Sequence, residues 1–513
     1  MLALPSDDGF HKVSTPFLVK FILKNPLKII QSPVFKSRLL GDLKVKMEKL
    51  HEECGIFGII ADRPINAAGH AAAALLSLQH RGQQSAGIVA FDGGKMIVKK
   101  DLGLVTDIFG QDFLDSCAFT HTAAGHVRYS AARENGINTT SNLSVNAQPI
   151  TVSHKCAAFS LSHNGSLTNA AHLRQKIAEK GGVFYTTNDS EIVAVLIVEQ
   201  CLKTHDLEKA VFNVMDAVEG AFSIIVGTED KLVAARDKNG FRPLCMGRLN
   251  GATVFASESC ALDCIGAEFV RDIAAGELVS ADKSGQIITL QKDLKGVKRG
   301  LCVFEYVYFA RPDSFIDGIS VHAARMEMGR LLFRQKPTNA DMVCGVPDSG
   351  ISAAYGYAEE SGIPYGSAFI KNRYVGRTFI APTQPKREQM VGSKLSPLKA
   401  SILGKRIVLV DDSIVRGTTS ANIIKALRVA GAKEVHMRIS SPPFKYPCYF
   451  GTDVDSRENL IANHYTVDEI CRKIGADSLV YLPYKDLMNI KFGRDVGFCG
   501  GCFDGKYPIK IIH

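Results

Sequence analysis

The spacing of apolar and polar residues divides the chain into two regions with different expected architectures. From Cys54 to about Ala281, short apolar segments alternate with turns rich in Gly and Asn, and helical patterns intervene. Short turns favour antiparallel sheets, because parallel strands need long crossover connections. We therefore expect layers of α and β structure here. Examples of the expected strands are 54–60, 87–91, 157–161, 221–226 and 232–235, and the most evident helical patterns are 67–78, 170–180 and 189–201.

From about Cys302 the pattern changes to continuous apolar strands that alternate with helices. Strands of this kind are typical of parallel βαβ units, in which helices cover both faces of the sheet. A polar stretch with several lysines, 284–300, separates the two regions. We predict one domain at 54–284 and a second at 300–513, which together make a mixed α/β and α+β fold. The strands expected in the second domain are 340–345, 407–410 and 434–439.

Residues 1–53 have a different character from the rest of the chain. Their apolar run is interrupted by lysines, which does not suit a secretory signal, and acidic residues near the start do not suit a transit peptide. Met47 would serve as an ordinary start. We expect 1–53 to be either a leader that is removed or a start assigned too far upstream.

Composition narrows the classes of protein that the chain can represent. Of its 513 residues, 46% are hydrophobic and 22% are charged, as in globular proteins. No uncharged apolar run approaches the roughly 18 to 20 residues that span a bilayer, so we expect no membrane association. The net charge of +9 is spread along the chain, whereas nucleic-acid binding needs a clustered basic patch. Thirteen cysteines, an odd number, indicate a reducing, cytoplasmic setting with catalytic or metal-bound thiols.

The most informative segment is Ile407–Ser420, which reads IVLVDDSIVRGTTS. Asp411 and Asp412 follow a buried strand, at the end where open α/β sheets bind ligands. Gly417 and the two threonines after it, Thr418 and Thr419, begin a helix whose free N–H groups can hold a phosphate. The carboxylates can meet ribose hydroxyls and position Mg²⁺. The alternative is a strand that ends in a solvated Asp–Asp turn.

The whole segment, including Arg416, resembles the phosphoribosyl pyrophosphate signature of type I phosphoribosyltransferases. VPDSG at 346–350 is similar to the loop that grips the pyrophosphate in that family, and KNRYVGRTFI at 371–380 to the mobile loop that closes over the site. The resemblance assigns the basic residues Lys371, Arg373 and Arg377 to the departing pyrophosphate, since fixed cations stabilise developing negative charge.

Cys54 opens a strand in the segment ECGIFGI. A lone cysteine in such a place is more often buried and inert. Other motifs change that interpretation: QHRGQQSAGI at 79–88, GHVRYS at 125–130, HNGSL at 163–167 and NDSE at 188–191. Together they resemble the αββα glutaminase domain of the N-terminal-nucleophile amidotransferases, in which a cysteine attacks an amide carbonyl and its own α-amino group acts as base.

The resemblance implies a role for each matching residue. Cys54 would be the first residue of the mature enzyme, which requires cleavage after Glu53. Arg128 would bind the glutamine carboxylate and Asp189 the α-ammonium group. The Asn164 side chain and the Gly165 N–H would form the oxyanion hole.

With both domains in one chain, residues from about 48 to 513 resemble the amidophosphoribosyltransferase family. Its enzymes use glutamine and phosphoribosyl pyrophosphate, pass ammonia through an internal channel, and make 5-phosphoribosylamine, glutamate and pyrophosphate in the first step of purine synthesis. The family forms tetramers and responds to purine nucleotides as feedback inhibitors. By resemblance, Mg²⁺ would lie at Ser349, Asp411 and Asp412. Gln84 stands where the family often has Glu.

Cys499 and Cys502 form a C-x-x-C pair, which alone suits half a zinc site, a redox pair or chance. Cys302 and Cys448 join them through resemblance only. All four match the positions that hold a [4Fe–4S] cluster in one branch of the family, and this branch is the one we expect.

Two other functions are consistent with part of the sequence. A different glutamine amidotransferase, such as one that makes glucosamine phosphate, would share the Cys54 domain but would lack Ile407–Ser420. A protein that only senses phosphoribosyl pyrophosphate would need neither a basic loop at 371–377 nor an intact glutaminase domain, and we expect it to carry a DNA-binding element.

Overall fold

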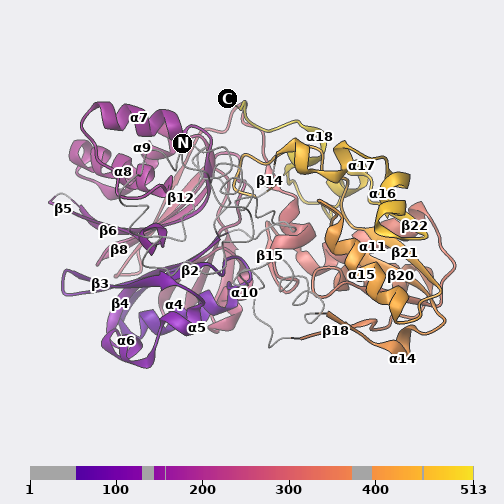
Figure 1. Ribbon diagram of the computed structural model, residues 1–513. Coiled ribbons are helices and arrows are strands. Elements are labelled where there is room, and N and C mark those ends of the chain that lie inside the picture. Colours follow the sequence, from indigo (N-terminus) through magenta and orange to yellow (C-terminus); the bar gives the residue numbers. More distant parts are fainter. Residues whose placement is uncertain are drawn as a thin grey trace, which may run out of the picture. The chain divides into compact units, whose positions relative to one another are not determined.

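The computed structural model describes residues 54–129, 144–155, 157–372, 395–452, 454 and 456–511 (Figure 1). The expected leader at 1–53 lies outside these ranges, and so do the predicted loop residues Arg373 and Arg377. No helix in the described ranges is long and apolar enough to cross a membrane.

The part of the chain that begins at Cys54 folds into two antiparallel sheets, as the short turns predict. The first sheet has the strand order β11 (Glu268–Asp272), β9 (Cys245–Leu249), β10 (Ala252–Ala256), β1 (Gly55–Ile65), β4 (Thr120–Arg128), β2 (Ser85–Asp92) and β3 (Lys95–Leu102). The second has the order β13 (Ile287–Gln291), β12 (Glu277–Asp282), β8 (Lys231–Arg236), β7 (Gly220–Gly227), β6 (Ala157–Leu167) and β5 (Ile150–His154).

Helices cover the outer face of each sheet (Figure 1). On the first sheet lie α4 (Ala67–Ser77), α5 (Val105–Ile108), α6 (Gln111–Ser116) and α10 (Ser259–Cys264). On the second lie α7 (Ala170–Glu179), α8 (Ser190–Thr204) and α9 (Leu207–Ala217). A third apolar cluster fills the space between the sheets. This α–β–β–α layering confirms the predicted first fold.

Strand β1 shows why its sequence reads as a continuous apolar run. Ile56 and Ile60 point into the space between the sheets, whereas Phe57 and Ile59 pack beneath the helices on the other face. Successive side chains of a strand alternate between faces, so a strand covered on both sides needs apolar residues at every position.

The second fold is built on a parallel sheet with the order β17 (Met342–Gly345), β20 (Arg406–Asp411), β21 (Glu434–Ile439) and β22 (Ser478–Tyr481). Val408 and Val410 pack with α11 (Val321–Gln335) and α12 (Ile351–Ser361) on one face. Ile407 and Leu409 pack with α15 (Thr418–Val429) and α16 (Val467–Ile474) on the other. The predicted parallel βαβ arrangement is confirmed.

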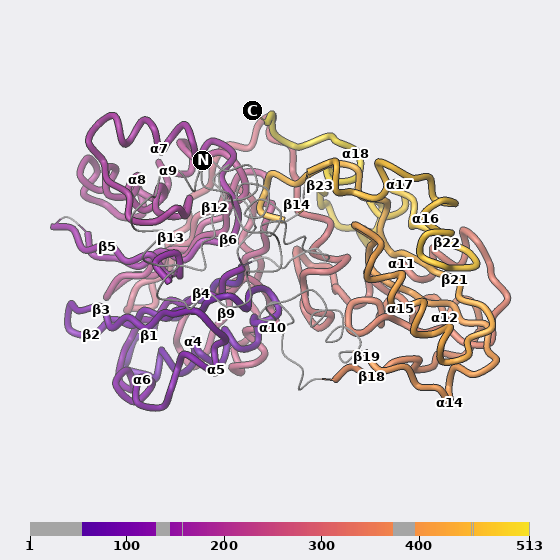
Figure 2. Tube along the Cα trace, in the orientation of Figure 1, coloured from indigo at the N-terminus to yellow at the C-terminus, as the bar shows by residue number. Residues whose placement is uncertain are grey.

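The segment between the folds differs from the predicted polar linker. Residues Ile287–Gln291, inside the stretch 284–300, form β13 and pair with β12 at the edge of the second sheet. Three of the five residues of β13, Ile287, Ile288 and Leu290, are apolar, so the strand interrupts the stretch that its polar and lysine residues marked as a linker. Farther on, β14 (Leu301–Cys302) pairs in parallel with β23 (Phe498–Cys499) and brings the two ends of the second fold side by side (Figure 2).

Helices α11 and α12 approach closely through glycines, which yields a test of the packing. A Cβ at Gly329 would lie 1.9 Å from the Ala353 carbonyl oxygen, a backbone atom. We expect Gly329→Ala to destabilise the second fold by about 1–3 kcal/mol, despite the gain in helix propensity. The control is Gly110→Ala, since a Cβ there meets nothing within 4 Å. Thermal unfolding followed by circular dichroism measures both; equal midpoints would contradict the packing.

Candidate active site

The candidate nucleophile lies at the start of a central strand. Cys54 directly precedes β1, and Gly55 pairs with Val127 on β4, so Cys54 lies beside the end of β4 where Arg128 stands. The thiol is partly buried and donates a hydrogen bond to the Tyr129 carbonyl at 3.5 Å. The Cys54 carbonyl in turn accepts a hydrogen bond from Arg81 Nε at 3.0 Å. Both the side chain and the main chain of Cys54 are therefore held.

Asn164 and Gly165, the predicted oxyanion-hole residues, lie on β6. The Asn164 side chain is fully buried, and neither atom of its amide has a hydrogen-bond partner in the described structure. Buried polar groups are almost always paired, so an amide left open in this way is available to a ligand. Gly165 has φ of +142°, and a Cβ there would lie 2.0 Å from the Ala221 carbonyl oxygen. The backbone geometry therefore requires glycine.

A buried histidine connects the Cys54 sheet to the Asn164 sheet. His126 Nε2, on β4, donates to the His163 carbonyl on β6 at 3.0 Å. Burial lowers the pKa of His126 to about 3, so the ring is neutral and one nitrogen carries the proton for this bond. The bond joins the strand that carries Arg128 to the strand that carries Asn164.

Arg128 and Asp189, which are predicted to bind glutamine, are each held by a hydrogen bond. Arg128 is only 2% exposed and donates to Gln84 Oε1 at 2.9 Å. One Asp189 carboxylate oxygen accepts from the Leu167 N–H at 2.8 Å, which holds the acid at the end of β6. A guanidinium and a carboxylate match the carboxylate and ammonium groups of an amino acid.

The second candidate site lies at the carboxyl ends of β17 and β20. Asp411 and Asp412 are 3% and 6% exposed, and the Asp411 carboxylate accepts from the Asp412 N–H at 3.0 Å. Ser349 Oγ donates to the Asp412 carboxylate, so the structure brings together two of the three predicted Mg²⁺ ligands from distant segments. A Cβ on Gly350 would lie 2.3 Å from the Val410 carbonyl oxygen, which shows how closely the VPDSG loop packs on β20.

The residues predicted to bind a phosphate lie at the start of α15. Gly417 has φ of +85° and forms the N-cap, and Thr418 and Thr419 are the first residues of the helix. Backbone N–H groups at a helix start have no intrahelical partner and attract anions. Lys371 pairs with Asp348 of the neighbouring loop, so the one basic residue of the 371–380 loop that the structure describes already reaches this site.

The four predicted cluster cysteines, Cys302, Cys448, Cys499 and Cys502, line one cavity. Cys302 and Cys499 are register partners in the β14–β23 pair. Burial raises the pKa of Cys502, and the other three thiols raise it further, as expected for neighbouring sulfurs. In the described ranges, no three His, Cys, Asp or Glu side chains are placed to hold one metal ion.

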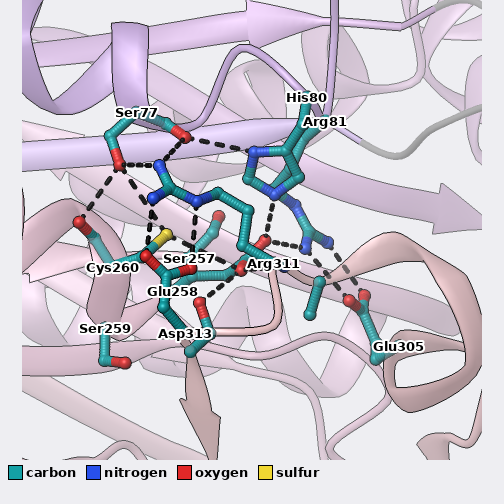
Figure 3. A network of polar contacts seen from close by, with 12 residues as sticks. Ser77, His80, Arg81, Ser257, Glu258, Ser259, Cys260, Glu305, Arg311 and Asp313 are labelled. Carbon is teal, nitrogen blue, oxygen red and sulfur yellow. Dashed lines mark hydrogen bonds and ion pairs between the residues drawn. The ribbon is translucent and has the colours of Figure 1, made fainter. Parts of the chain in front are cut away.

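A buried charge network near Cys54 was not among the predicted site residues. Arg81 is fully buried and donates to both Glu258 and Glu305 (Figure 3). Arg81 belongs to the segment QHRGQQSAGI, but Glu258 and Glu305 lie in segments that gave no signal of their own. Only the folded chain brings these charges together.

Comparison with known proteins places both halves of the chain. Glutamine amidotransferase domains match residues 137–264, and phosphoribosyl transferase domains match residues 322–440. The amidophosphoribosyltransferase of Synechocystis is 46% identical over 469 residues, which covers 90% of this chain and 92% of that protein. That of Bacillus subtilis is 44% identical over 472 residues, with 91% and 96% coverage.

Two solved structures share the fold. One is the glutamine phosphoribosylpyrophosphate amidotransferase from B. subtilis complexed with ADP and GMP, with a TM-score of 0.81 and 43% identity, covering 90% of this chain and 98% of that one. The other is described as the allosteric regulatory enzyme of purine biosynthesis, with a TM-score of 0.82, 44% identity, and 90% and 97% coverage.

Proposed function

The chain belongs to the amidophosphoribosyltransferase family, and from that premise we propose which residues carry out its two half-reactions. The enzyme transfers ammonia released from glutamine to phosphoribosyl pyrophosphate. The products are 5-phosphoribosylamine, glutamate and pyrophosphate, and the reaction is the first step of purine biosynthesis.

In the glutamine half-reaction, the Cys54 sulfur attacks the side-chain amide carbon of glutamine. The amide C=O becomes an oxyanion, which Asn164 Nδ2–H and the Gly165 N–H stabilise. Collapse of this intermediate breaks the C–N bond, releases ammonia and leaves a thioester on Cys54, which water then hydrolyses to glutamate. The observation that carries this assignment is the fully buried Asn164 amide with no partner in the described structure.

The base in this scheme is the α-amino group of Cys54, which exists only if the chain is cut after Glu53. The amine takes the thiol proton and later gives it to the departing ammonia. A chain that continues upstream of Cys54 offers only an amide nitrogen, which cannot act as a base.

We assign glutamine binding to Arg128 and Asp189. Arg128 would form a bidentate ion pair with the α-carboxylate, and Asp189 would accept a hydrogen bond from the α-ammonium group. Gln84 already holds the Arg128 side chain, and the Leu167 N–H already holds the Asp189 side chain. The two side chains therefore lose little conformational entropy when glutamine binds.

In the second half-reaction, Asp411 and Asp412 bind the ribose hydroxyls. Gly417, Thr418 and Thr419 hold the 5-phosphate at the start of α15, with Arg416 beside them. Asp348, Ser349 and Gly350 face the pyrophosphate, and Lys371, Arg373 and Arg377 stabilise its charge as it departs.

The oxygen-rich pair of Ser349 and Asp412, with the neighbouring Asp411, suits a hard cation such as Mg²⁺. When bound, Mg²⁺ neutralises pyrophosphate charge.

We propose a [4Fe–4S] cluster held by Cys302, Cys448, Cys499 and Cys502. Four thiols that line one cavity supply the soft ligands that an iron–sulfur cluster requires. When bound, the cluster would link the β14–β23 strand pair to the loop that carries Cys448.

The proposed setting follows from the family. We propose a cytoplasmic tetramer that purine nucleotides inhibit; the relative from B. subtilis was solved with ADP and GMP.

Replacing the nucleophile separates the half-reactions. Cys54→Ala should abolish phosphoribosylamine formation from glutamine and leave formation from added ammonia, because the second site keeps all its groups. Assays with each nitrogen source measure both. Loss of both activities in a folded variant would contradict the assignment.

The oxyanion hole predicts a loss of rate without a loss of stability. Asn164→Ala should slow glutamine hydrolysis by about 100- to 1000-fold. Its unfolding midpoint should stay near that of the parent, since no bond is lost among the described residues. The matched control is Asn146→Ala, whose buried amide bonds to Thr187 and whose loss should lower the midpoint instead. A destabilised Asn164→Ala variant with normal kcat would refute the assignment.

The cysteine cavity predicts the metal content. Protein purified without oxygen should contain about four iron and four sulfide per chain, as a [4Fe–4S] cluster requires. Cys499→Ser should lose both, whereas Cys264→Ser, at an exposed thiol, should keep them. Zinc in place of iron would overturn the cluster assignment.

A further inference from the structure

Arg81 is a fully buried arginine whose donors are shared between two carboxylates and the candidate nucleophile. Nη1 donates to Glu258 Oε1 at 2.6 Å and to Glu305 Oε2 at 3.0 Å, and Nη2 donates to Glu305 Oε1 at 2.8 Å. Nε donates to the Cys54 carbonyl at 3.0 Å. The guanidinium is planar and rigid, so these bonds fix its place and orientation together.

The two carboxylates come from different folds. Glu258 directly precedes α10 on the first sheet, whereas Glu305 opens the π-helical segment η3 (Glu305–Phe309), which follows β14 of the second fold. Figure 3 shows Arg81 between them, with His80 and Arg311 alongside. Glu258 is itself fixed by His80 Nε2 at 2.8 Å and by Ser314 Oγ at 2.6 Å. Arg81 is thus held by a carboxylate from each fold, Glu258 and Glu305.

This arrangement is costly to disturb. Burial alone lowers the pKa of Arg81, but Glu305 and Glu258 outweigh it and hold the pKa well above its usual value. A buried ion pair need not stabilise a fold relative to apolar packing, but removing one partner leaves an unpaired buried charge. Such a network is therefore stiff, and it transmits any shift of Glu305 to the Arg81 guanidinium.

The hydrogen bond from Arg81 Nε to the Cys54 carbonyl connects this rigid network to the candidate nucleophile. The carbonyl position sets the peptide plane between Cys54 and Gly55 and the place of the Cys54 Cα. Only rotation about the Cα–C bond then sets the direction of the bonds from this Cα to its nitrogen and its Cβ. For a residue that is both nucleophile and base, that direction decides whether the amine, the thiol and the substrate carbon align. A misplacement of about 1 Å at such a centre can cost roughly 100-fold in rate.

We propose that Arg81 is the positioning residue for the Cys54 nucleophile and that Glu305, from the second fold, holds Arg81 in its productive place. The proposal rests on the proposed function of Cys54. The proposal makes Glu305 of the second fold a part of the glutamine site. A glutaminase domain without Glu305 would therefore have a misaligned nucleophile.

A second buried arginine provides the matched control. Arg236, on β8, is 1% exposed and pairs through both terminal nitrogens with Asp317, at 2.8 and 3.1 Å. It joins the same two folds with the same chemistry. Its other hydrogen bonds go to the carbonyls of Ile273 and Gly240.

The experiment compares Arg81→Lys, Glu305→Gln and Arg236→Lys in the full-length enzyme. A lysine keeps the charge but has one nitrogen, which cannot reach Cys54, Glu258 and Glu305 together. We expect Arg81→Lys to lower kcat for glutamine hydrolysis by about 100-fold, with KM changed less than about threefold and the ammonia-dependent rate within about twofold. Glu305→Gln should shift kcat in the same direction by less, and Arg236→Lys should not.

A direct readout of the nucleophile separates positioning from general loss of structure. Iodoacetamide labels Cys54 and the exposed Cys264, and mass spectrometry gives the ratio of their rates at several pH values. Arg81→Lys should lower the Cys54 rate relative to Cys264 and change its pH profile, whereas Arg236→Lys should change neither.

Two results would overturn the proposal. One is parallel loss of glutamine- and ammonia-dependent activity in Arg81→Lys; the other is a normal kcat and labelling ratio in both Arg81→Lys and Glu305→Gln. If Arg81→Lys does not fold, Glu305→Gln decides alone, since it keeps the side-chain shape. Failure of the proposed function is distinct, because Cys54→Ala would then retain glutamine-dependent activity.

Discussion

The glutamine site depends on the position of β1, which is paired on both edges and covered on both faces. β10 and β4 flank it, Ile56 and Ile60 lie between the sheets, and Phe57 lies under the helices. A strand held in this way cannot slip by one residue without turning its apolar side chains to the wrong face. Cys54 lies one residue before the strand, so the strand also fixes the position of Cys54.

The other groups of the site are placed relative to β1 by the same sheets. Arg128 ends the neighbouring strand, and His126, two residues earlier, bonds across to the strand that carries Asn164. The phosphoribosyl site follows a similar rule, since Asp411 and Asp412 stand at the end of a buried parallel strand. In both folds a rigid strand presents the reactive residue at its end, where side chains are no longer constrained to pack.

The two folds are also joined by buried charge. Arg81 with Glu305 and Arg236 with Asp317 each place an arginine of the first fold against a carboxylate of the second. Ion pairs of this kind add little net stability over apolar packing, but they define one geometry, because any other leaves a charge unpaired. An enzyme that makes ammonia at one site and uses it at another needs such a defined arrangement.

Much of this could be predicted from the sequence where the pattern was strong. The strand expected at 434–439 is β21 with the same ends, and the residues expected to begin a helix, Thr418 and Thr419, do so. The strand β3 was not expected, because it lies at a sheet edge and carries Lys and Asp at exposed positions. Periodicity detects burial, and an edge strand has little of it.

The site residues also divide into those that a local motif predicts and those that only the fold brings together. Asn164, Arg128 and Asp412 lie in recognisable motifs, and Ser349 Oγ donates a hydrogen bond to the Asp412 carboxylate. The partnership of Arg81 with Glu258 and Glu305 joins residues 177 and 224 positions apart in the sequence, with nothing local to suggest it. Single-sequence patterns report what a residue is near along the chain, and these bonds depend on what the fold brings near.

The mass and amino-terminal sequence of the enzyme purified in its active form test most directly whether the Cys54 amine is the base. If the Cys54 amine is the base, the active protein begins at Cys54, and its mass corresponds to residues 54–513. An enzyme with full glutamine-dependent activity that retains Glu53 or any residue before it would contradict the claim, because its Cys54 nitrogen would be an amide.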